Sequence, residues 1–309
     1  MHSKRLHDQQ GDGDGVVPTL AGLMALRARA VGYRPPRRGH AGPGGRAPSP
    51  LRGRGMEYAE SREYAPGDDV RHIDWKVTAR SGTPHTKLFQ AERERVTLVV
   101  ADTAPALYFG TRVRFKSVQA ARAGALAAWM AVRDGDRVAA LRGSGSESPV
   151  KPAGGARGAL RVLDALVRWY ARQPPDDEGL DVALEHAARV LRPGSRILVL
   201  ADPASALAVP RHRWSSLAVH NQVLVLLPVD PLELDPPSEP VALATGGRRV
   251  ELDLGRASSR QRWRNAYVAP LETALARLPL QGVRAAALPC DGDGGEWMDL
   301  FAVPRSVRA

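Results

Sequence analysis

The chain has 309 residues, of which 43% are hydrophobic, so it is long enough to bury the core of one large domain with appended segments. Its single cysteine, Cys290, excludes an intramolecular disulfide and favours a reducing compartment. No apolar run reaches the roughly 18–20 residues that a membrane helix needs. Residues 1–15 also lack the apolar core of a signal peptide, and we therefore expect a cytoplasmic protein.

The net charge of +11 is concentrated at the beginning of the chain. Residues 1–55 contain ten Lys or Arg and three Asp, which accounts for seven of the eleven net charges. Because this part is also rich in Gly and Pro, it cannot bury enough apolar surface to fold, and we predict a basic flexible leader. Such a leader offers one alternative function, non-specific binding of nucleic acid, although basic tails commonly only solubilise a protein.

One stretch of this leader has a helical pattern. Its apolar residues recur with a near-helical period at Leu20, Leu23, Met24, Leu26 and Val31. Since Pro18 is tolerated in a first helical turn, the pattern predicts a short docking helix over residues 18–31. Residues 34–55 that follow have the composition of a flexible linker.

After Arg95 the chain alternates between apolar strands and helices. The predicted strands are Thr97–Ala101, Arg137–Leu141, Arg196–Ala201, Gln222–Pro228 and Val283–Leu288. The predicted helices are Arg114–Arg133, Gly158–Arg172, Leu180–Leu191 and Ser258–Leu278. Continuous apolar strands separated by helices indicate βαβ units, so residues 96–309 are predicted to form a doubly wound, mostly parallel, Rossmann-type α/β domain. Val250–Leu254 is a candidate edge strand, and residues 230–240 are expected to form a loop.

Residues 56–95 are predicted to be an extended element with turns. The tetrapeptide Ala65–Asp68 predicts a tight turn, because Pro presets one dihedral angle and Gly accepts a positive one. Lys87–Ala91 is expected to form a short strand leading into the core. Within this element, residues 62–80 read REYAPGDDVRHIDWKVTAR and combine charges of both signs with one Trp.

These charges have a structural and a functional interpretation. The set comprises Arg62, Glu63, Asp68, Asp69, Arg71, Asp74, Trp75 and Arg80. Because acidic and basic groups are nearly balanced, we interpret them as a structural network whose members neutralise one another where the element meets the sheet. The alternatives are a partner-binding surface, or a hydrolytic or metal cluster in which carboxylates act with His72.

The segment 62–80 resembles the family catalogued as domain of unknown function 58, whose pattern is R-E-Y-x-P-G-D-D-x-R-x-I-D-W-x-x-x-A-R. Further segments similar to this family are Phe109–Arg112, Gly135–Val138 and Val229–Glu233. The resemblance implies a von Willebrand factor A-like domain after the extended element. Because such proteins are commonly encoded beside MoxR-type AAA+ ATPases, it also implies a non-enzymatic adaptor or assembly factor that works with such an ATPase.

The same resemblance implies a metal-ion-dependent adhesion site, with the pattern D-x-S-x-S after the first strand. Here Asp102 matches, but Ala104 and Ala106 stand at the serine positions, and Leu180 stands at the position of a further threonine ligand. The last position of the pattern, an aspartate after a later strand, is matched by Asp202. Since Mg²⁺ requires several oxygen ligands, we expect a degenerate site without metal or other cofactor, in which the two aspartates cap helices or pair with arginines. The alternative is a metal-dependent binder or hydrolase that uses both aspartates.

No catalytic residue is assigned from the sequence. Loops at the carboxyl ends of strands form an adaptable surface on a rigid scaffold. We therefore expect a partner-binding rim that contains Asp102, Tyr108, Arg112 and Asp202.

Overall fold

The computed structural model describes residues 15–34, 56–65, 67–91, 95–245 and 248–302. The chain divides into two compact units. An α/β unit comprises residues 1–38 and 96–309, and a small unit comprises residues 39–95. Most of the predicted flexible leader, residues 1–14 and 35–55, lies outside the described residues.

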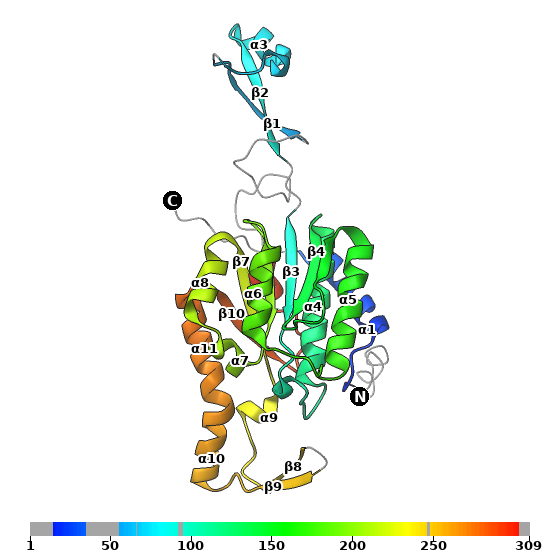
Figure 1. Ribbon diagram of the computed structural model, residues 1–309, viewed down its shortest axis with the longest axis vertical. Coiled ribbons are helices and arrows are strands. Elements are labelled where there is room, and N and C mark those ends of the chain that lie inside the picture. The colour runs from blue at the N-terminus through cyan, green and yellow to red at the C-terminus, as the bar shows by residue number, and fades with distance from the viewer. Residues whose placement is uncertain (1–14, 35–55, 66, 92–94, 246–247, 303–309) are drawn as a thin grey trace, which may run out of the picture. The chain divides into compact units, whose positions relative to one another are not determined.

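A six-stranded sheet forms the centre of the α/β unit (Figure 1). Its strands, in spatial order, are β10 (Arg284–Pro289), β7 (Gln222–Val229), β6 (Arg196–Leu200), β3 (Val96–Ala101), β4 (Arg137–Arg142) and β5 (Val150–Ala153). Every neighbouring pair is parallel except β4 and β5. The predicted mostly parallel α/β sheet is therefore confirmed. From β3 the chain builds first toward β5 and then from β6 toward β10, so the strand order reverses between β3 and β6.

Two layers of helices cover the two faces of this sheet (Figure 1). The first layer contains α1 (Leu20–Ala25), α2 (Arg27–Gly32), α4 (Lys116–Arg133), α5 (Gly155–Ala171) and α12 (Met298–Ala302). The second contains α6 (Leu180–Val190), α7 (Pro203–Ala208), α8 (Arg211–His220) and α11 (Ala269–Leu280). Alternate strand residues serve opposite layers: Val99 and Ala101 pack in the first core cluster, Leu98 and Val100 in the second. Continuous apolar strands are thus explained by burial on both faces.

The helix predicted over residues 18–31 is present as the two short helices α1 and α2. It packs against α4 and α5 as part of the α/β unit. Leu23 and Ala30 are fully buried there, and the Trp129 indole N–H donates to the Leu23 carbonyl at 3.2 Å. No described helix is both long and apolar enough to cross a membrane.

Several elements differ from the sequence-based prediction. The antiparallel strand β5 and the helices α7 and α8 were not predicted, and a helical turn, α9 (Pro231–Leu234), lies in the expected loop. The prediction of an edge strand at Val250–Leu254 needs a correction: the strand is β9 (Arg248–Leu252), and among the described residues it pairs with β8 (Val241–Thr245) in a separate two-stranded sheet.

The helix predicted over Ser258–Leu278 is present but not uniform. It consists of α10 (Ala257–Trp263), the π-helical turn η3 (Arg264–Val268) and α11. Pro270 near the start of α11 has no N–H, and its ring would collide with the carbonyl one turn earlier. A wider π turn immediately before it relieves this conflict.

The small unit is built on a hairpin. Strand β1 (Met56–Glu63) pairs antiparallel with β2 (His85–Ala91), so the strand predicted at Lys87–Ala91 belongs to this hairpin and not to the main sheet. Between the strands lie the 3₁₀ turn η1 (Val70–His72) and the helix α3 (Trp75–Ser81). The predicted extended element with turns is present as this hairpin, but the prediction missed helix α3. The cause of this helix is local: the Asp74 carboxylate accepts from the amides of residues 76 and 77, which starts a helix.

At the amino ends of the strands, one buried ion pair joins β6 to the start of β4. Arg196, 2% exposed, donates from Nη2 to Asp136 Oδ2 at 2.6 Å and from Nη1 to Asp134 Oδ2 at 3.0 Å. The Thr97 hydroxyl of β3 donates to the same Asp136 oxygen at 2.7 Å. Three neighbouring strand starts are therefore linked through one guanidinium.

Replacing Asp136 by Ala removes the closer and more buried partner of Arg196 and leaves only Asp134, which is 20% exposed in its side chain, so the free energy of unfolding should fall by about 3 kcal/mol. The matched control is Arg256→Ala, which breaks an exposed ion pair with Asp253 and should cost less than about 1 kcal/mol. Urea denaturation of the three proteins measures both values. Equal losses for the two variants would contradict a supporting role for the buried pair.

Candidate functional site

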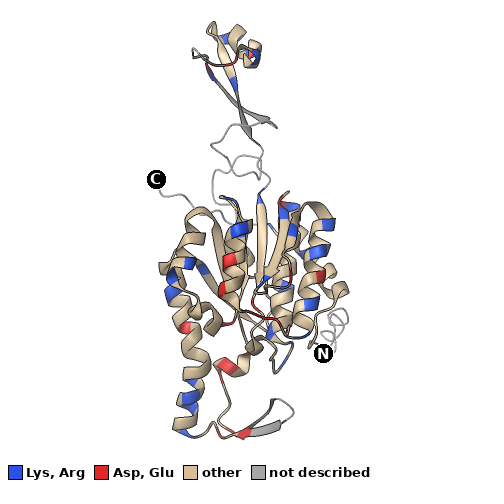
Figure 2. Ribbon diagram, viewed as in Figure 1, with Lys and Arg blue, Asp and Glu red and all other residues tan. Residues whose placement is uncertain are grey.

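Ligand sites of open α/β sheets lie beyond the carboxyl ends of the strands where the strand order reverses. In this chain that position is next to the ends of β3 and β6. We call the charged residues gathered there the strand-end crevice: Asp102, Lys116, Asp202, Asp230 and Glu233. All five are 8% exposed or less. Figure 2 shows further Lys and Arg residues on the helices of both layers.

A lysine ammonium lies within this crevice. Lys116, the first residue of α4, is 2% exposed, and its Nζ lies 2.6 Å from Glu233 Oε1 and 3.7 Å from Asp202 Oδ1. Burial raises the pKa of the Glu233 carboxyl, while the neighbouring ammonium opposes this shift. The second Glu233 oxygen accepts from the Asp230 amide at 3.0 Å and completes a capping box for α9.

The two aspartates kept from the metal-site pattern bind backbone amides. Asp102 accepts from the Ala104 amide at 3.0 Å and from the Asp202 amide at 2.9 Å, and it also receives the Ser205 hydroxyl. Asp202 accepts from the Ala204 amide at 3.0 Å and so caps α7. Both carboxylates therefore hold loops in place, and the cation beside Asp202 is a lysine instead of the expected arginine.

The residues present do not fit a bound Mg²⁺ ion. Ala104 and Ala106 supply no side-chain oxygen, and Leu180, at the third lost position, is 3% exposed within the apolar core. Lys116 brings a positive charge to Asp202, where the pattern would place a metal. Within the described ranges, no three His, Cys, Asp or Glu residues are grouped to hold a metal ion.

The loop between β3 and α4 is fastened on both sides. The Tyr108 hydroxyl donates to the Trp169 carbonyl at 2.6 Å, and burial raises its pKa. The Thr111 amide donates to Asp230 at 2.9 Å, and its hydroxyl binds the same carboxylate. Arg112, the residue after Thr111, is exposed and has no side-chain partner among the described residues. Of the four predicted rim residues, Arg112 is therefore exposed, Tyr108 is half-buried, and Asp102 and Asp202 are buried.

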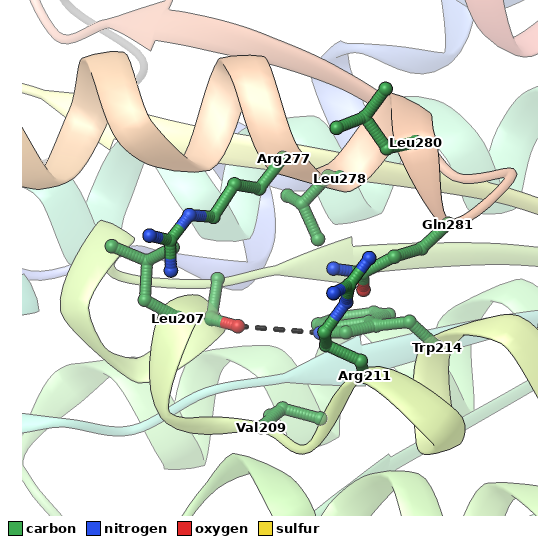
Figure 3. Close-up of a pocket in the computed structure, with 9 residues that line it drawn as sticks. Leu207, Val209, Arg211, Trp214, Arg277, Leu278, Leu280 and Gln281 are labelled. Atoms are coloured by element: carbon green, nitrogen blue, oxygen red, sulfur yellow. Dashed lines mark hydrogen bonds between the residues drawn. The ribbon is translucent and has the colours of Figure 1, made fainter.

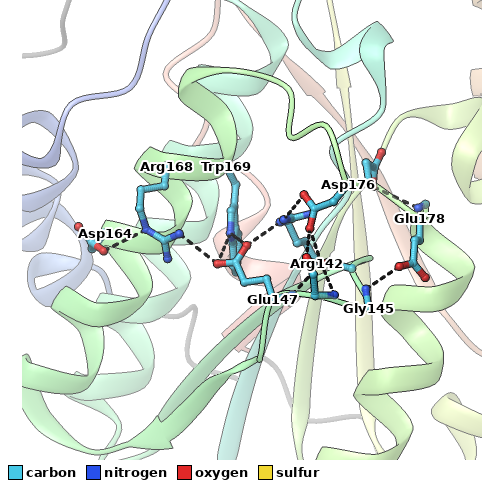
Figure 4. A network of polar contacts seen from close by, with 12 residues as sticks. Arg142, Gly145, Glu147, Asp164, Arg168, Trp169, Asp176 and Glu178 are labelled. Carbon is cyan, nitrogen blue, oxygen red and sulfur yellow. Dashed lines mark hydrogen bonds and ion pairs between the residues drawn. The ribbon is translucent and has the colours of Figure 1, made fainter.

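A second polar network lies at the end of β4 (Figure 4). Arg142, 5% exposed, donates to Glu147 at 2.8 Å and to Asp176 at 2.7 Å. Hydrogen bonds from Ser146 and Ser144, together with Arg142, hold the pKa of the Asp176 carboxyl well below its usual range. The network needs a close approach of two loops, because a Cβ on Gly143 would lie 2.0 Å from the carbonyl oxygen of residue 179.

Nothing in the sequence analysis indicated this network or the pairing of Lys116 with Glu233. Both depend on residues distant in the chain; Lys116 and Glu233 are 117 positions apart. In the sequence, the glycines after β4 were the available sign of the network and the Lys at a helix start was the available sign of the ion pair. Neither sign shows which distant residues take part.

In the small unit, one ion pair is found within the predicted charged set among the described residues, Arg62 with Asp68 at 2.7 Å. The aspartates instead accept from backbone amides: Asp68 from residue 65, Asp69 from residue 71, and Asp74 from residues 76 and 77. Glu63, Arg71 and Arg80 are exposed, and Trp75 is 72% exposed. The set therefore shapes local turns more than it neutralises charge.

The chain is thus an α/β protein with a mostly parallel sheet and a separate small hairpin unit. It belongs to the family described as protein of unknown function DUF58, whose model matches residues 60–272. Uncharacterized proteins of Mycobacterium tuberculosis and Mycobacterium bovis are 32% identical over 189 residues, which is 60% of this chain. The match spans 58% of the length of these relatives.

Among solved structures, an aerotolerance-related membrane protein from Bacteroides fragilis NCTC 9343 aligns with a TM-score of 0.41 and 14% identity. The alignment covers 67% of this chain and 96% of that one.

Replacing Lys116 by Met should leave two carboxylates buried without their cation and lower the free energy of unfolding by about 3–5 kcal/mol at neutral pH. The double variant Lys116→Met/Glu233→Gln removes both charges of the closer pair and keeps an acceptor for the Asp230 amide, so it should recover part of this loss. Denaturant unfolding of the single and double variants measures the coupling energy between Lys116 and Glu233.

Calorimetric titration of the wild type with Mg²⁺ or Mn²⁺ should give no site tighter than millimolar. A micromolar site abolished by Asp102→Asn would contradict the conclusion that these residues do not fit a metal ion.

Burial raises the pKa of Asp102 from 3.8 to about 6, against the amides and hydroxyl that bind its ionised form. Between these two pH values the folded state binds more protons than the unfolded state. The contribution of Asp102 to the free energy of unfolding therefore falls as the pH rises from about 3.8 to about 6, and it is constant above about pH 6. Across this window the wild type should lose up to roughly 3 kcal/mol relative to Asp102→Asn. Unfolding by urea at a series of pH values measures the difference, and parallel curves for the two proteins would disprove the shift.

Proposed function

We propose that this protein is a non-enzymatic adaptor or assembly factor with a von Willebrand factor A-like α/β unit, and that it acts in the cytoplasm with a MoxR-type AAA+ ATPase. The fold-family assignment and the partner class come from the family resemblance. The strand order, which reverses between β3 and β6, and the helices on both faces support the fold-family assignment.

The observation that carries the proposal is the ammonium of Lys116 in the strand-end crevice. It supplies a fixed positive charge between Glu233 and Asp202, beside the position where the pattern of this fold family would place a metal ion. The crevice therefore obtains its cation from the chain itself. Its carboxylates are used to hold backbone amides, which is a structural role.

This arrangement fixes the loop that carries Arg112. Because Thr111 is bound to Asp230 and Tyr108 to the backbone of α5, the exposed Arg112 guanidinium is presented from a fastened loop. A rigidly presented charge loses little conformational entropy when it binds, which favours protein recognition. We assign Arg112 as the central contact of the rim and the buried aspartates as its support.

Co-purification of the full-length protein with the MoxR-type ATPase of its own genome tests this proposal. Association is expected in at least one nucleotide state. Arg112→Glu should reduce the affinity by about tenfold or more, because like charges replace opposite ones at the contact.

The matched control is Arg161→Glu, which reverses an exposed arginine on α5 and should leave association unchanged. Binding that is lost equally in both variants would indicate a general charge effect and not a rim contact. Failure of the wild type to associate in every nucleotide state would exclude this partner class.

A further inference from the structure

A hollow of about 330 Å³ opens on the flank of the second helix layer (Figure 3). It lies between the end of α7, the start of α8 and the end of α11, and it shares no residue with the strand-end crevice. Its volume is at the lower end of the range of about 300–1,000 Å³ for small ligand sites.

The floor of this hollow is apolar. Trp214, Leu278 and Val209 line it and are 1%, 2% and 5% exposed. The indole N–H of Trp214 already donates to the Ala206 carbonyl at 3.3 Å, so its ring offers the hollow apolar surface. Leu280, also in the lining, is 78% exposed, which leaves an uncovered aliphatic side chain beside the floor.

Two cationic groups accompany this floor. Arg211 on α8 and Arg277 on α11 line the hollow, and Figure 3 shows both guanidinium groups beside it. Neither has a hydrogen-bond or ion-pair partner among the described residues. No carboxylate belongs to the lining, so the electrostatic preference of the hollow is for an anion.

A third polar group narrows the choice of ligand. The side-chain carbonyl oxygen of Gln281 is buried in the lining and accepts no hydrogen bond. A buried acceptor left unsatisfied is unfavourable, and it gains a partner only from a ligand or water that donates. An aliphatic carboxylate has no such donor, whereas a peptide has a backbone N–H close to its terminal carboxylate.

We propose that this hollow binds the free carboxyl terminus of a polypeptide that ends in an apolar residue. The terminal carboxylate pairs with Arg211 and Arg277, the last side chain packs on Trp214 and Leu278, and a backbone N–H donates to Gln281. Capture of a C-terminal carboxylate is a recurrent mode of peptide recognition. The proposal concerns a surface separate from the strand-end crevice and does not depend on the ATPase being the partner.

Calorimetric titration of the full-length protein tests it with three probes: an acetylated tetrapeptide ending in Leu with a free carboxylate, the same peptide as its carboxyl-terminal amide, and decanoate. The free acid should bind at least about tenfold more tightly than the amide, because the amide cannot form the charge-assisted hydrogen bonds. It should also bind more tightly than decanoate. An amide that binds as well as the acid would overturn the proposal.

Variants then assign the contacts. Arg211→Glu and Arg277→Glu should each lower the affinity for the free-acid peptide by about tenfold or more, whereas Arg161→Glu on the other helix layer should not lower it. Gln281→Met should lower the affinity for the peptide and leave the affinity for decanoate unchanged. Melting curves check that each variant is folded. Tighter binding of decanoate than of the peptide, unaffected by Gln281→Met, would overturn the peptide assignment in favour of an acyl ligand.

Discussion

The ion pair between Lys116 and Glu233 is the constraint on which the strand-end face depends. It joins the start of α4, after β3, to α9, after β7, while Asp202 beside the ammonium caps the helix after β6. Three successive strand ends are thereby fixed by one buried charge. Because a charge in a low-dielectric interior tolerates no missing partner, the loops around it have little freedom to rearrange.

A buried cation is stabilised at each end of the sheet, but by different groups. At the strand starts, Arg196 uses its planar fork to bind two aspartates directly. At the strand ends, Lys116 acts as a point charge, and the carboxylates around it are mainly saturated by backbone amides. Between these polar ends the strands are apolar on both faces, and both helix layers pack against this apolar surface.

The core of the sheet was predictable from sequence because burial on both faces produces apolar runs such as residues 97–101. The strand-end aspartates were also identified, since they follow those runs directly. The partner of Lys116 was not, because no local pattern relates it to a glutamate on a short turn after another strand. Helix α3 was missed for another reason. The charged sequence before it is typical of a turn, but the Asp74 carboxylate accepts from backbone amides and so caps the start of a helix.

The edge strand β5 restricts how other molecules can approach the sheet. It has four residues, runs antiparallel to its neighbour and contains Pro152, which cannot donate a backbone hydrogen bond. A short edge with a proline is a poor template for an additional strand. Extension of this sheet across β5 by β-augmentation is therefore disfavoured, and assemblies of this protein at that side must be made through side chains of loops and helices.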